Sequence, residues 1–272
     1  MGKYSVLMSL YSKEKPEYLK QSIESMLHQT LLPDEIVIVK DGPLTDELEE
    51  VLREYQDKYT GLFHLVTSEK NIGLGLALNL GLQECKNEFV ARMDTDDISL
   101  PTRCEKQLKL FENNQELSIV GTMVDEFINS PKEIISSRVV PTSHREIYEY
   151  AKRRSAFNHP TVLYRKSKVL ECGGYRDLKR NQDVDLFGRM LFHGCQAANL
   201  NESLLLFRSN ENLLKRRRNW MNTKSYITTI YNLWKIGYSR LSDVVIVAGA
   251  QIVIFCSPVK FQNWIYKTFL RK

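Results

Sequence analysis

Residues 89–103 read FVARMDTDDISLPTR, and this stretch says most about the fold class. An apolar run typical of a buried strand leads directly into Asp94, Asp96 and Asp97, and Pro101 then marks the start of a helical pattern. Short apolar runs at 4–10, 35–40 and 63–67 upstream, and at 119–124 downstream, are predicted strands that alternate with amphipathic stretches of helical period. Strands and helices that alternate at this spacing predict an α/β fold with a mostly parallel, doubly wound sheet.

The three carboxylates lie where such a sheet binds ligands, at the carboxyl end of a strand. Carboxylates this close together repel one another unless a cation lies among them. Oxygen ligands favour Mg²⁺ or Mn²⁺, which commonly link protein carboxylates to substrate phosphates. Acidic residues are also common in the first turn of a helix, where they complement its dipole. The residues alone therefore leave two interpretations open, a metal site and a helix N-terminus.

Two further loops are expected at the same edge of the sheet. One follows a predicted strand, and the other precedes a predicted helix. Asp41-Gly42 follows the strand EIVIVK, where the carboxylate either accepts a hydrogen bond from a nucleobase or simply forms a turn. Asn71 and Gly73 precede a helix whose free backbone N–H groups suit a ribose or a phosphate. The segment is not a dinucleotide fingerprint, because Leu78 stands where the third glycine belongs.

Asp183 and Asp185 fall in the first turn of a helix predicted over residues 181–193. Two residues apart, they diverge by about 200° around the axis, so only one of them can face a given cleft. Each is also a candidate helix cap. His159, in Asn158-His159-Pro160, is interpreted from the residues alone as structural.

Composition limits the compartment and the partners. Five cysteines, an odd number without a Cys-x-x-Cys pair, argue against a disulfide framework or a thiolate zinc site and favour a reducing compartment. From residue 208 onward, 12 Lys/Arg and 2 Asp/Glu give +10, so the first 207 residues carry 5 − 10 = −5. Such a basic tail favours an anionic surface as partner. No nucleic-acid partner is predicted, because no helix-turn-helix, zinc-finger or RNP signature is present.

The C-terminal region combines basic and apolar segments. Residues 215–218 are Lys-Arg-Arg-Arg, and the apolar run 244–256 is shorter than the roughly twenty residues that span a bilayer. Aromatic residues then alternate with cations over 260–272, as in helices that lie in a membrane interface. These features predict peripheral docking on an anionic membrane, and a helical subdomain that covers the sheet or forms a dimer contact is the alternative.

Six blocks together resemble the family 2 glycosyltransferases, inverting enzymes of the GT-A (Rossmann-like) fold. In order they are SVLMSLYS (5–12), SIESMLHQT (22–30), EIVIVKDG (35–42), NIGLGLALNLG (71–81), FVARMDTDDISLPTR (89–103) and GGYRDLKRNQDVDLFGRM (173–190). The resemblance covers residues 4–207. It is strongest to bacterial enzymes of surface-polysaccharide and lipopolysaccharide assembly, often galactosyltransferases.

The resemblance implies a role for each candidate residue. Asp183 would be the catalytic base, Asp96 a metal ligand, and Asp94 a ligand of the metal or the ribose. Donor-binding residues would be Ser9, Tyr11, Asp41, Asn71, Gly73, Arg92 and Asp94, with His159 and Gln182 toward the acceptor. The chain departs from the family pattern at Lys40 and Pro43, which flank Asp41-Gly42, and at Gln182, where Glu is frequent.

The resemblance also implies an organisation and a reaction. Residues 1–210 would form the GT-A domain, with a nucleotide-sugar-binding half over 1–125 and an acceptor-binding half over 126–210, followed by a basic helical region over 211–272. RRRNW at 216–220 replaces the Gln-x-x-Arg-Trp element of processive synthases, so one sugar would be added rather than a polymer.

The expected donor is a UDP-hexose, used with Mn²⁺ or Mg²⁺, and the expected acceptor is a saccharide, free or lipid-linked. The enzyme would be cytoplasmic and peripheral on the inner face of the cell membrane. A nucleotidyltransferase is one alternative, although residues 9–15 lack a Gly-rich phosphate loop. A non-catalytic sugar-nucleotide-binding protein is the other.

Overall fold

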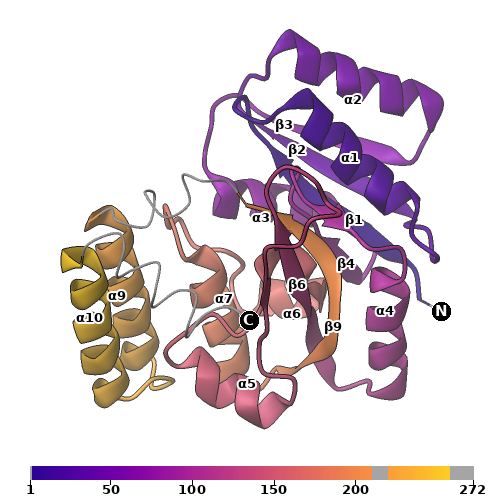
Figure 1. Ribbon diagram of the computed structural model, residues 1–272. Helices are drawn as coiled ribbons and strands as arrows, with labels where there is room; N and C mark the ends of the chain where they lie inside the picture. Colours follow the sequence, from indigo (N-terminus) through magenta and orange to yellow (C-terminus); the bar gives the residue numbers. More distant parts are fainter. Residues whose placement is uncertain (1, 210–219, 258–272) are drawn as a thin grey trace.

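A computed structural model describes residues 2–209 and 220–257 of the chain. One sheet forms its centre, with the strand order β3-β2-β1-β4-β8-β6-β9-β5 and with β7 paired to β6 (Figure 1). The first four strands are β1 (Tyr4–Leu10), β2 (Glu35–Asp41), β3 (Phe63–Ser68) and β4 (Phe89–Arg92), and they pair in parallel. Because these parallel strands point the same way, their carboxyl ends meet at one edge.

Helices cover both faces of this parallel part, which confirms the predicted α/β class. Side chains of α1 (Pro16–Leu27), α2 (Asp46–Lys58) and α4 (Arg103–Asn113) share one hydrophobic core with Val6, Met8 and Ile38. On the opposite face, α3 (Leu74–Glu84) packs on Leu7 and Val37. Successive side chains of β1 and β2 thus pack alternately into the two cores, because side chains along a strand point to opposite faces of the sheet.

The second half of the sheet mixes strand directions. Its strands are β5 (Ile98–Ser99), β6 (Leu117–Phe127), β7 (Ser136–Arg138), β8 (Leu163–Arg165) and β9 (Gln196–Arg208). β6 and β9 run parallel, whereas β8 is antiparallel to both β4 and β6. The helices of this half are α5 (His144–Ala151), the short 3₁₀ helix η1 (His159–Thr161), α6 (Lys166–Glu171) and α7 (Gln182–Phe192). β6 is continuous across residues 125 and 126, so one sheet serves both predicted halves.

A helical hairpin stands beside α7 at the side of the sheet (Figure 1). It consists of α9 (Trp220–Lys235) and α10 (Leu241–Cys256). Ile230 and Leu233 of α9 join the core that contains α7, and at Gly188 an added Cβ would lie only 2.7 Å from Leu233. None of the described helices is long and apolar enough to cross a membrane. The basic cluster 215–218 and the aromatic segment 260–272 lie outside the described residues.

Two boundaries differ from the sequence predictions. The helix expected to start at Pro101 begins at Arg103, because residues 98 and 99 form the short strand β5 and a turn follows it. The strand expected over 119–124 extends from Leu117 to Phe127, where it pairs with β9, a strand that the sequence pattern did not predict.

Candidate active site

The predicted donor-site residues gather at the carboxyl edge of the parallel strands. Ser9 lies near the end of β1, Asp41 ends β2 and Arg92 ends β4. The order β2-β1-β4 makes these strands direct neighbours. Tyr11 follows β1 and is exposed.

Asp41 holds the loop that leads into α3. Its carboxylate accepts hydrogen bonds from the backbone N–H groups of Ile72 (2.7 Å) and Gly73 (3.1 Å) and from the side-chain amide of Asn71 (3.0 Å). Gly42 has a φ of +88°, and an added Cβ would lie 2.7 Å from the nitrogen of Asn71. The structure therefore brings Asp41, Asn71 and Gly73 together, with much of the carboxylate's hydrogen-bonding capacity used within the protein.

The acidic residues after β4 form a tight cluster. Single carboxylate oxygens of Asp94, Asp96 and Asp97 all lie within 4.8 Å of one another. Asp97 is fully buried, and its Oδ2 has no hydrogen-bond partner among the described residues. Burial and the neighbouring carboxylates raise the pKa of Asp97 well above its usual value. A buried, unpartnered carboxylate oxygen beside two more carboxylates fits a divalent cation with oxygen ligands.

Arg92 connects this cluster to the other half of the site. Its buried guanidinium donates through Nη2 to Asp94 Oδ1, while Nε and Nη1 have no partner among the described residues. Burial raises the pKa of both Asp96 and Asp183, and the positive charge of Arg92 offsets part of each increase. Arg92 thus lies near both carboxylates and has N–H donors left for an anionic ligand.

Asp183 lies in the first turn of α7 and is half-buried. The hydroxyl oxygen of Ser155 lies 3.5 Å from its Oδ2. Burial raises the pKa of Asp183 above its usual value, while its backbone hydrogen bonds and the charges of Arg138 and Arg92 lower it. A carboxylate whose basicity is raised in this way is suited to accept a proton from a hydroxyl group.

Asp185 serves a different purpose from Asp183. It is fully buried, accepts a 2.8 Å hydrogen bond from Arg189 Nε and lies 3.2 Å from Arg176 Nη1. Arg189 also donates to the carbonyl oxygens of Cys172 and Gly174. Asp185 therefore anchors α7 to the Gly173-Gly174 turn.

Removal of Asp185 should therefore cost stability. Asp185→Ala leaves the buried Arg189 guanidinium without its counter-charge, and we expect a loss of about 3 kcal/mol in the free energy of unfolding. Asp177→Ala, an exposed aspartate in the same block, should change it by less than about 0.5 kcal/mol. Urea denaturation of both variants measures the difference. Equal stabilities would contradict the structural role.

Of the two predicted acceptor-side residues, Gln182 begins α7, and the ring of His159 lies 5.9 Å from that of Phe187 on the same helix. His159 Nε2 is 2.9 Å from the Tyr175 hydroxyl, and burial, followed by the charge of Arg92, lowers the pKa of His159 well below its usual value. This contact fits the structural interpretation of His159 that the residues alone suggested. Gln182 is buried, and its Oε1 has no partner among the described residues.

Comparison with known proteins places the chain in a family. The profile described as Glycosyl transferase family 2 matches residues 5–174, more than half of the chain. The chain belongs to glycosyl transferase family 2. The match includes β1 to β4, the Asp94–Asp97 cluster and His159, and it ends before Asp183.

Similar proteins support this assignment. The amylovoran biosynthesis glycosyltransferase AmsE of Erwinia amylovora is 41% identical over 224 residues, 82% of this chain and 83% of its own. A UDP-Gal:alpha-D-GlcNAc-diphosphoundecaprenol beta-1,3-galactosyltransferase of Escherichia coli is 34% identical over 270 residues, 99% and 97% of the two chains. The mannosyltransferase PcManGT of Pyrobaculum calidifontis, solved with GDP-Man and Mn²⁺, matches with a TM-score of 0.65 at 13% identity, over 97% and 78% of the chains. This last likeness confirms the glycosyltransferase fold.

One residue of this family 2 glycosyltransferase was missed by sequence reasoning. Arg208, at the end of β9, donates from its backbone N–H to Asp97 Oδ1 and from Nε to the carbonyl oxygen of Asp96, each at 2.8 Å. Its guanidinium also stacks on the rings of Tyr18 and Phe127, 3.9 and 4.5 Å from their centroids. In the sequence, Arg208 stands at the start of the basic C-terminal region, and nothing in its neighbourhood indicates a contact with Asp96 or Asp97.

Metal affinity should depend on pH because of Asp96. Burial, with the charges of Asp94 and Glu14, raises the pKa of Asp96 to about 7. Below that pH the carboxyl group holds a proton that a cation has to displace, so binding should weaken by up to about tenfold per pH unit. Titration of Mn²⁺ at about pH 6 and about pH 8 measures this, with Asp96→Asn as the variant in which the pH dependence should become smaller. A pH-independent affinity would rule out Asp96 as a ligand.

Proposed function

We propose that this chain is a non-processive, inverting glycosyltransferase of bacterial surface-polysaccharide synthesis. It moves one sugar from a nucleotide-sugar, a UDP-hexose, to a saccharide acceptor that is linked to a lipid diphosphate. The observation that carries the proposal is the position of Asp183 and the Asp94–Asp97 cluster near the same buried Arg92. The name of the Erwinia relative, an amylovoran biosynthesis enzyme, supports the polysaccharide context. The name of the Escherichia relative supports a UDP-linked donor and a lipid-diphosphate-linked acceptor.

The reaction is a single displacement at the anomeric carbon of the donor. Asp183 takes the proton of the acceptor hydroxyl while the acceptor oxygen forms its bond to the anomeric carbon. The bond from that carbon to the phosphate oxygen breaks, and the nucleoside diphosphate leaves with the electron pair. Attack from the face opposite the leaving group inverts the configuration, and no protein nucleophile is needed.

Residues at the strand edge position the donor. Asp94 and Asp96, with Asp97 beside them, would hold Mn²⁺ or Mg²⁺, which as a Lewis acid stabilises the charge of the leaving diphosphate. The free N–H groups of Arg92 add to that stabilisation. Ser9, Tyr11, Asn71 and Gly73 line the nucleoside side, where Asp41 contributes both by holding the 71–73 loop and by reading the base. On the acceptor side, His159 and Gln182 contact the saccharide.

A donor screen tests the proposal. Nucleotide sugars are offered one at a time with a diphosphate-linked saccharide acceptor, with Mn²⁺, with Mg²⁺ and with excess chelator. We expect metal-dependent transfer from a UDP-hexose and thermal stabilisation by UDP plus metal. Release of a sugar phosphate would favour the nucleotidyltransferase, and binding without turnover of any donor would favour the non-catalytic protein.

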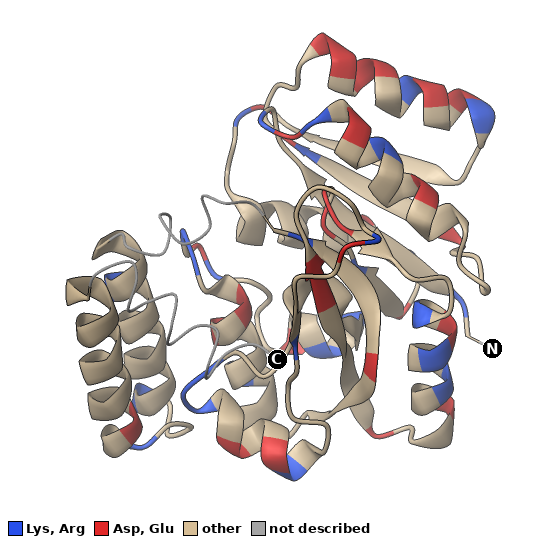
Figure 2. Cartoon of the chain, viewed as in Figure 1, with Lys and Arg blue, Asp and Glu red and all other residues tan. Residues whose placement is uncertain are grey.

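We also propose that the α9–α10 hairpin docks the enzyme on the cytoplasmic face of an anionic membrane. Its two helices carry only three charged residues, Lys224, Lys235 and Asp243, and are almost uniformly tan in Figure 2. Large apolar side chains are exposed along them: Trp220, Met221, Tyr231, Leu241, Val245, Ile246, Ile252 and Val253. Helices of this kind bind in the membrane interface, and docking raises the local concentration of a lipid-linked acceptor.

A charge on the exposed face of α10 should weaken that docking. Val245 and Leu32 are both 64% exposed, but Leu32 lies outside the hairpin, before β2. Val245→Asp should reduce co-sedimentation with phosphatidylglycerol-containing vesicles several-fold, because a charge in the interface opposes apolar insertion. Leu32→Asp should leave co-sedimentation unchanged. Vesicle binding that is equal in the two variants, or absent in the wild type at low salt, rules the hairpin out as the docking surface.

A further inference from the structure

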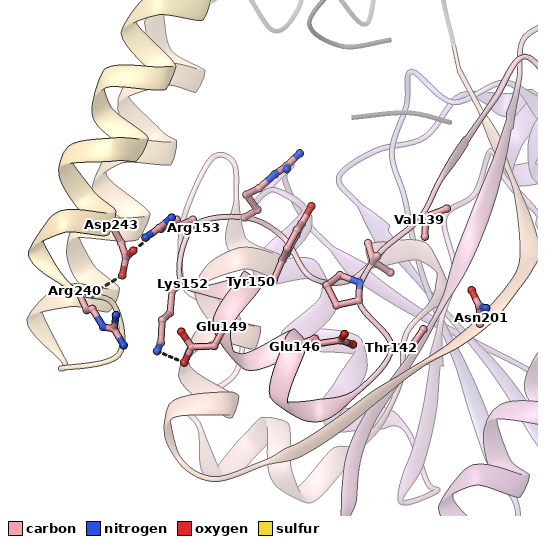
Figure 3. Close-up of a pocket in the computed structure, with 13 residues that line it drawn as sticks. Val139, Thr142, Glu146, Glu149, Tyr150, Lys152, Arg153, Asn201, Arg240 and Asp243 are labelled. Atoms are coloured by element: carbon pink, nitrogen blue, oxygen red, sulfur yellow. Dashed lines mark hydrogen bonds and ion pairs between the residues drawn. The ribbon is translucent and has the colours of Figure 1, made fainter. Parts of the chain in front are cut away.

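A cavity of about 760 Å³ lies between α5, the loop that precedes it and the first turn of α10. Figure 3 shows that Tyr150 and Arg153 come from α5 and the turn after it, Arg240 and Asp243 from the start of α10, and Val139 from the opposite side. The volume is within the range of ligand pockets, about 300–1,000 Å³. None of the site residues described above lines this cavity, which is called the α5–α10 pocket below.

Charges in the α5–α10 pocket are only partly compensated. Lys152 lies 2.6 Å from Glu149, and Arg153 pairs with Asp243, as Figure 3 shows. Arg154 forms no ion pair with a described residue, and its guanidinium lies over the ring of Tyr150, 5.1 Å from the centroid. A half-buried arginine with its position fixed by an aromatic ring, but without a counter-charge, is suited to bind an anion.

The pocket begins next to the candidate catalytic base. Ser155, whose hydroxyl lies 3.5 Å from Asp183 Oδ2, directly follows Arg154 in the chain. On the other side of this segment, the Tyr226 hydroxyl donates to the carbonyl oxygen of Arg153 at 3.1 Å. Arg154 is therefore one residue along the chain from the hydroxyl group that contacts Asp183.

The far end of the pocket opens toward an apolar surface. Arg240 and Asp243 line the pocket at the first turn of α10, and the neighbouring side chains Leu241, Val245 and Ile246 are exposed. From Asp183 outward, the described part of the chain thus presents a base, a cation without an ion-pair partner there, and an apolar helix. These three groups match, in order, the hydroxyl of a saccharide, a diphosphate and a lipid chain.

We propose that the α5–α10 pocket binds the diphosphate of a lipid-diphosphate-linked acceptor, with Arg154 as its main contact and Arg240 as a second. This assignment rests on the proposed glycosyl transfer and names the residues that select the acceptor. The planar guanidinium of Arg154 donates two parallel hydrogen bonds to phosphate oxygens. The lipid leaves the pocket over α10, while the saccharide extends back toward Asp183.

Two acceptors that differ only in the diphosphate test the proposal. Both carry the same sugar and an alkyl chain of the same length, joined through a diphosphate in one and through a neutral ether in the other. KM and kcat are measured for the wild type, Arg154→Gln, Arg154→Lys and Arg240→Gln. Arg145→Gln is the matched control, because Arg145 is exposed on α5 and outside the pocket.

The wild type should favour the diphosphate acceptor, and Arg154→Gln should raise the KM for it by about tenfold or more, as for a lost charge-assisted hydrogen bond. Arg154→Lys and Arg240→Gln should have smaller effects. The KM for the neutral acceptor and for the donor should stay unchanged in every variant, which also shows that the variants are folded.

Three results would overturn the assignment. They are a wild type without preference for the diphosphate, an equal effect of Arg154→Gln and Arg145→Gln, and a rise in the donor KM that matches the rise for the acceptor. The last result would place the donor's diphosphate, not the acceptor's, at Arg154. Absence of transfer to either acceptor from any nucleotide sugar would instead contradict the proposed function itself.

Discussion

Asp183→Asn should lower kcat by about 10²–10⁴, the usual effect of losing a general base. The substitution keeps the shape of the side chain and its place in the first turn of α7, but the amide cannot take the proton of the acceptor hydroxyl. Donor binding should hardly change, because donor contacts come from the strand edge. Initial rates at saturating donor and acceptor measure kcat, and the affinity for UDP measures donor binding.

Two controls make this test specific. Asp177→Asn places the same substitution at an exposed position six residues upstream and should keep wild-type turnover. Unfolding by urea should show that Asp183→Asn is as stable as the wild type, unlike the Asp185 variant. Near-normal turnover of Asp183→Asn would remove Asp183 as the base. Asp185 would not replace it without movement of α7, since both of its oxygens already contact arginines.

Loss of the carboxylate at Asp96 should have an effect of similar size. A metal that stabilises the leaving diphosphate contributes several kcal/mol, so Asp96→Ala should lower turnover by about 10²–10⁴-fold. The variant should bind the nucleotide-sugar more weakly with Mn²⁺ present, and as well as the wild type in chelator. Isothermal titration with and without Mn²⁺ separates the two conditions.

The matched control is Asp57→Ala, an exposed aspartate on α2 that should change neither turnover nor metal-dependent binding. Chelation of the wild type should abolish transfer, and added Mn²⁺ should restore it. Full activity of the wild type in excess chelator would exclude the metal role of the cluster, whatever the variant does.

The parallel part of the fold follows from sequence patterns, whereas β9 does not. β1 to β4 are short apolar runs bounded by turn residues, and periodicity is enough to predict them. β9 contains Asn199, Asn201, Glu202 and Ser203 in its centre, so its pattern is too polar for a strand prediction. It forms because it pairs in parallel with β6 and antiparallel with β5. Both partners are far away in the sequence, so a pattern of neighbouring residues cannot reveal the pairing.

The candidate site also contains residues that the sequence predicts and residues that it does not. The loops that follow β2 and β4 were predicted to lie at one edge of the sheet because parallel strands end at the same edge. The two strands do end at that edge, on either side of β1. Arg208 was missed because it reaches Asp97 across 111 residues of chain. The sequence does contain a local pattern that distinguishes Asp183 from Asp185. Asp185 and Arg189 are spaced i,i+4 on one helix, which favours an ion pair.

The anomeric configuration of the product tests the central claim most directly. The wild type is incubated with a UDP-α-hexose, Mn²⁺ and a diphosphate-linked saccharide acceptor, and the purified product is analysed by NMR and mass spectrometry. A single displacement assisted by Asp183 predicts one added sugar in β configuration, made only when metal is present. A product that retains the α configuration, or free sugar and UDP without a glycosylated acceptor, would contradict the account.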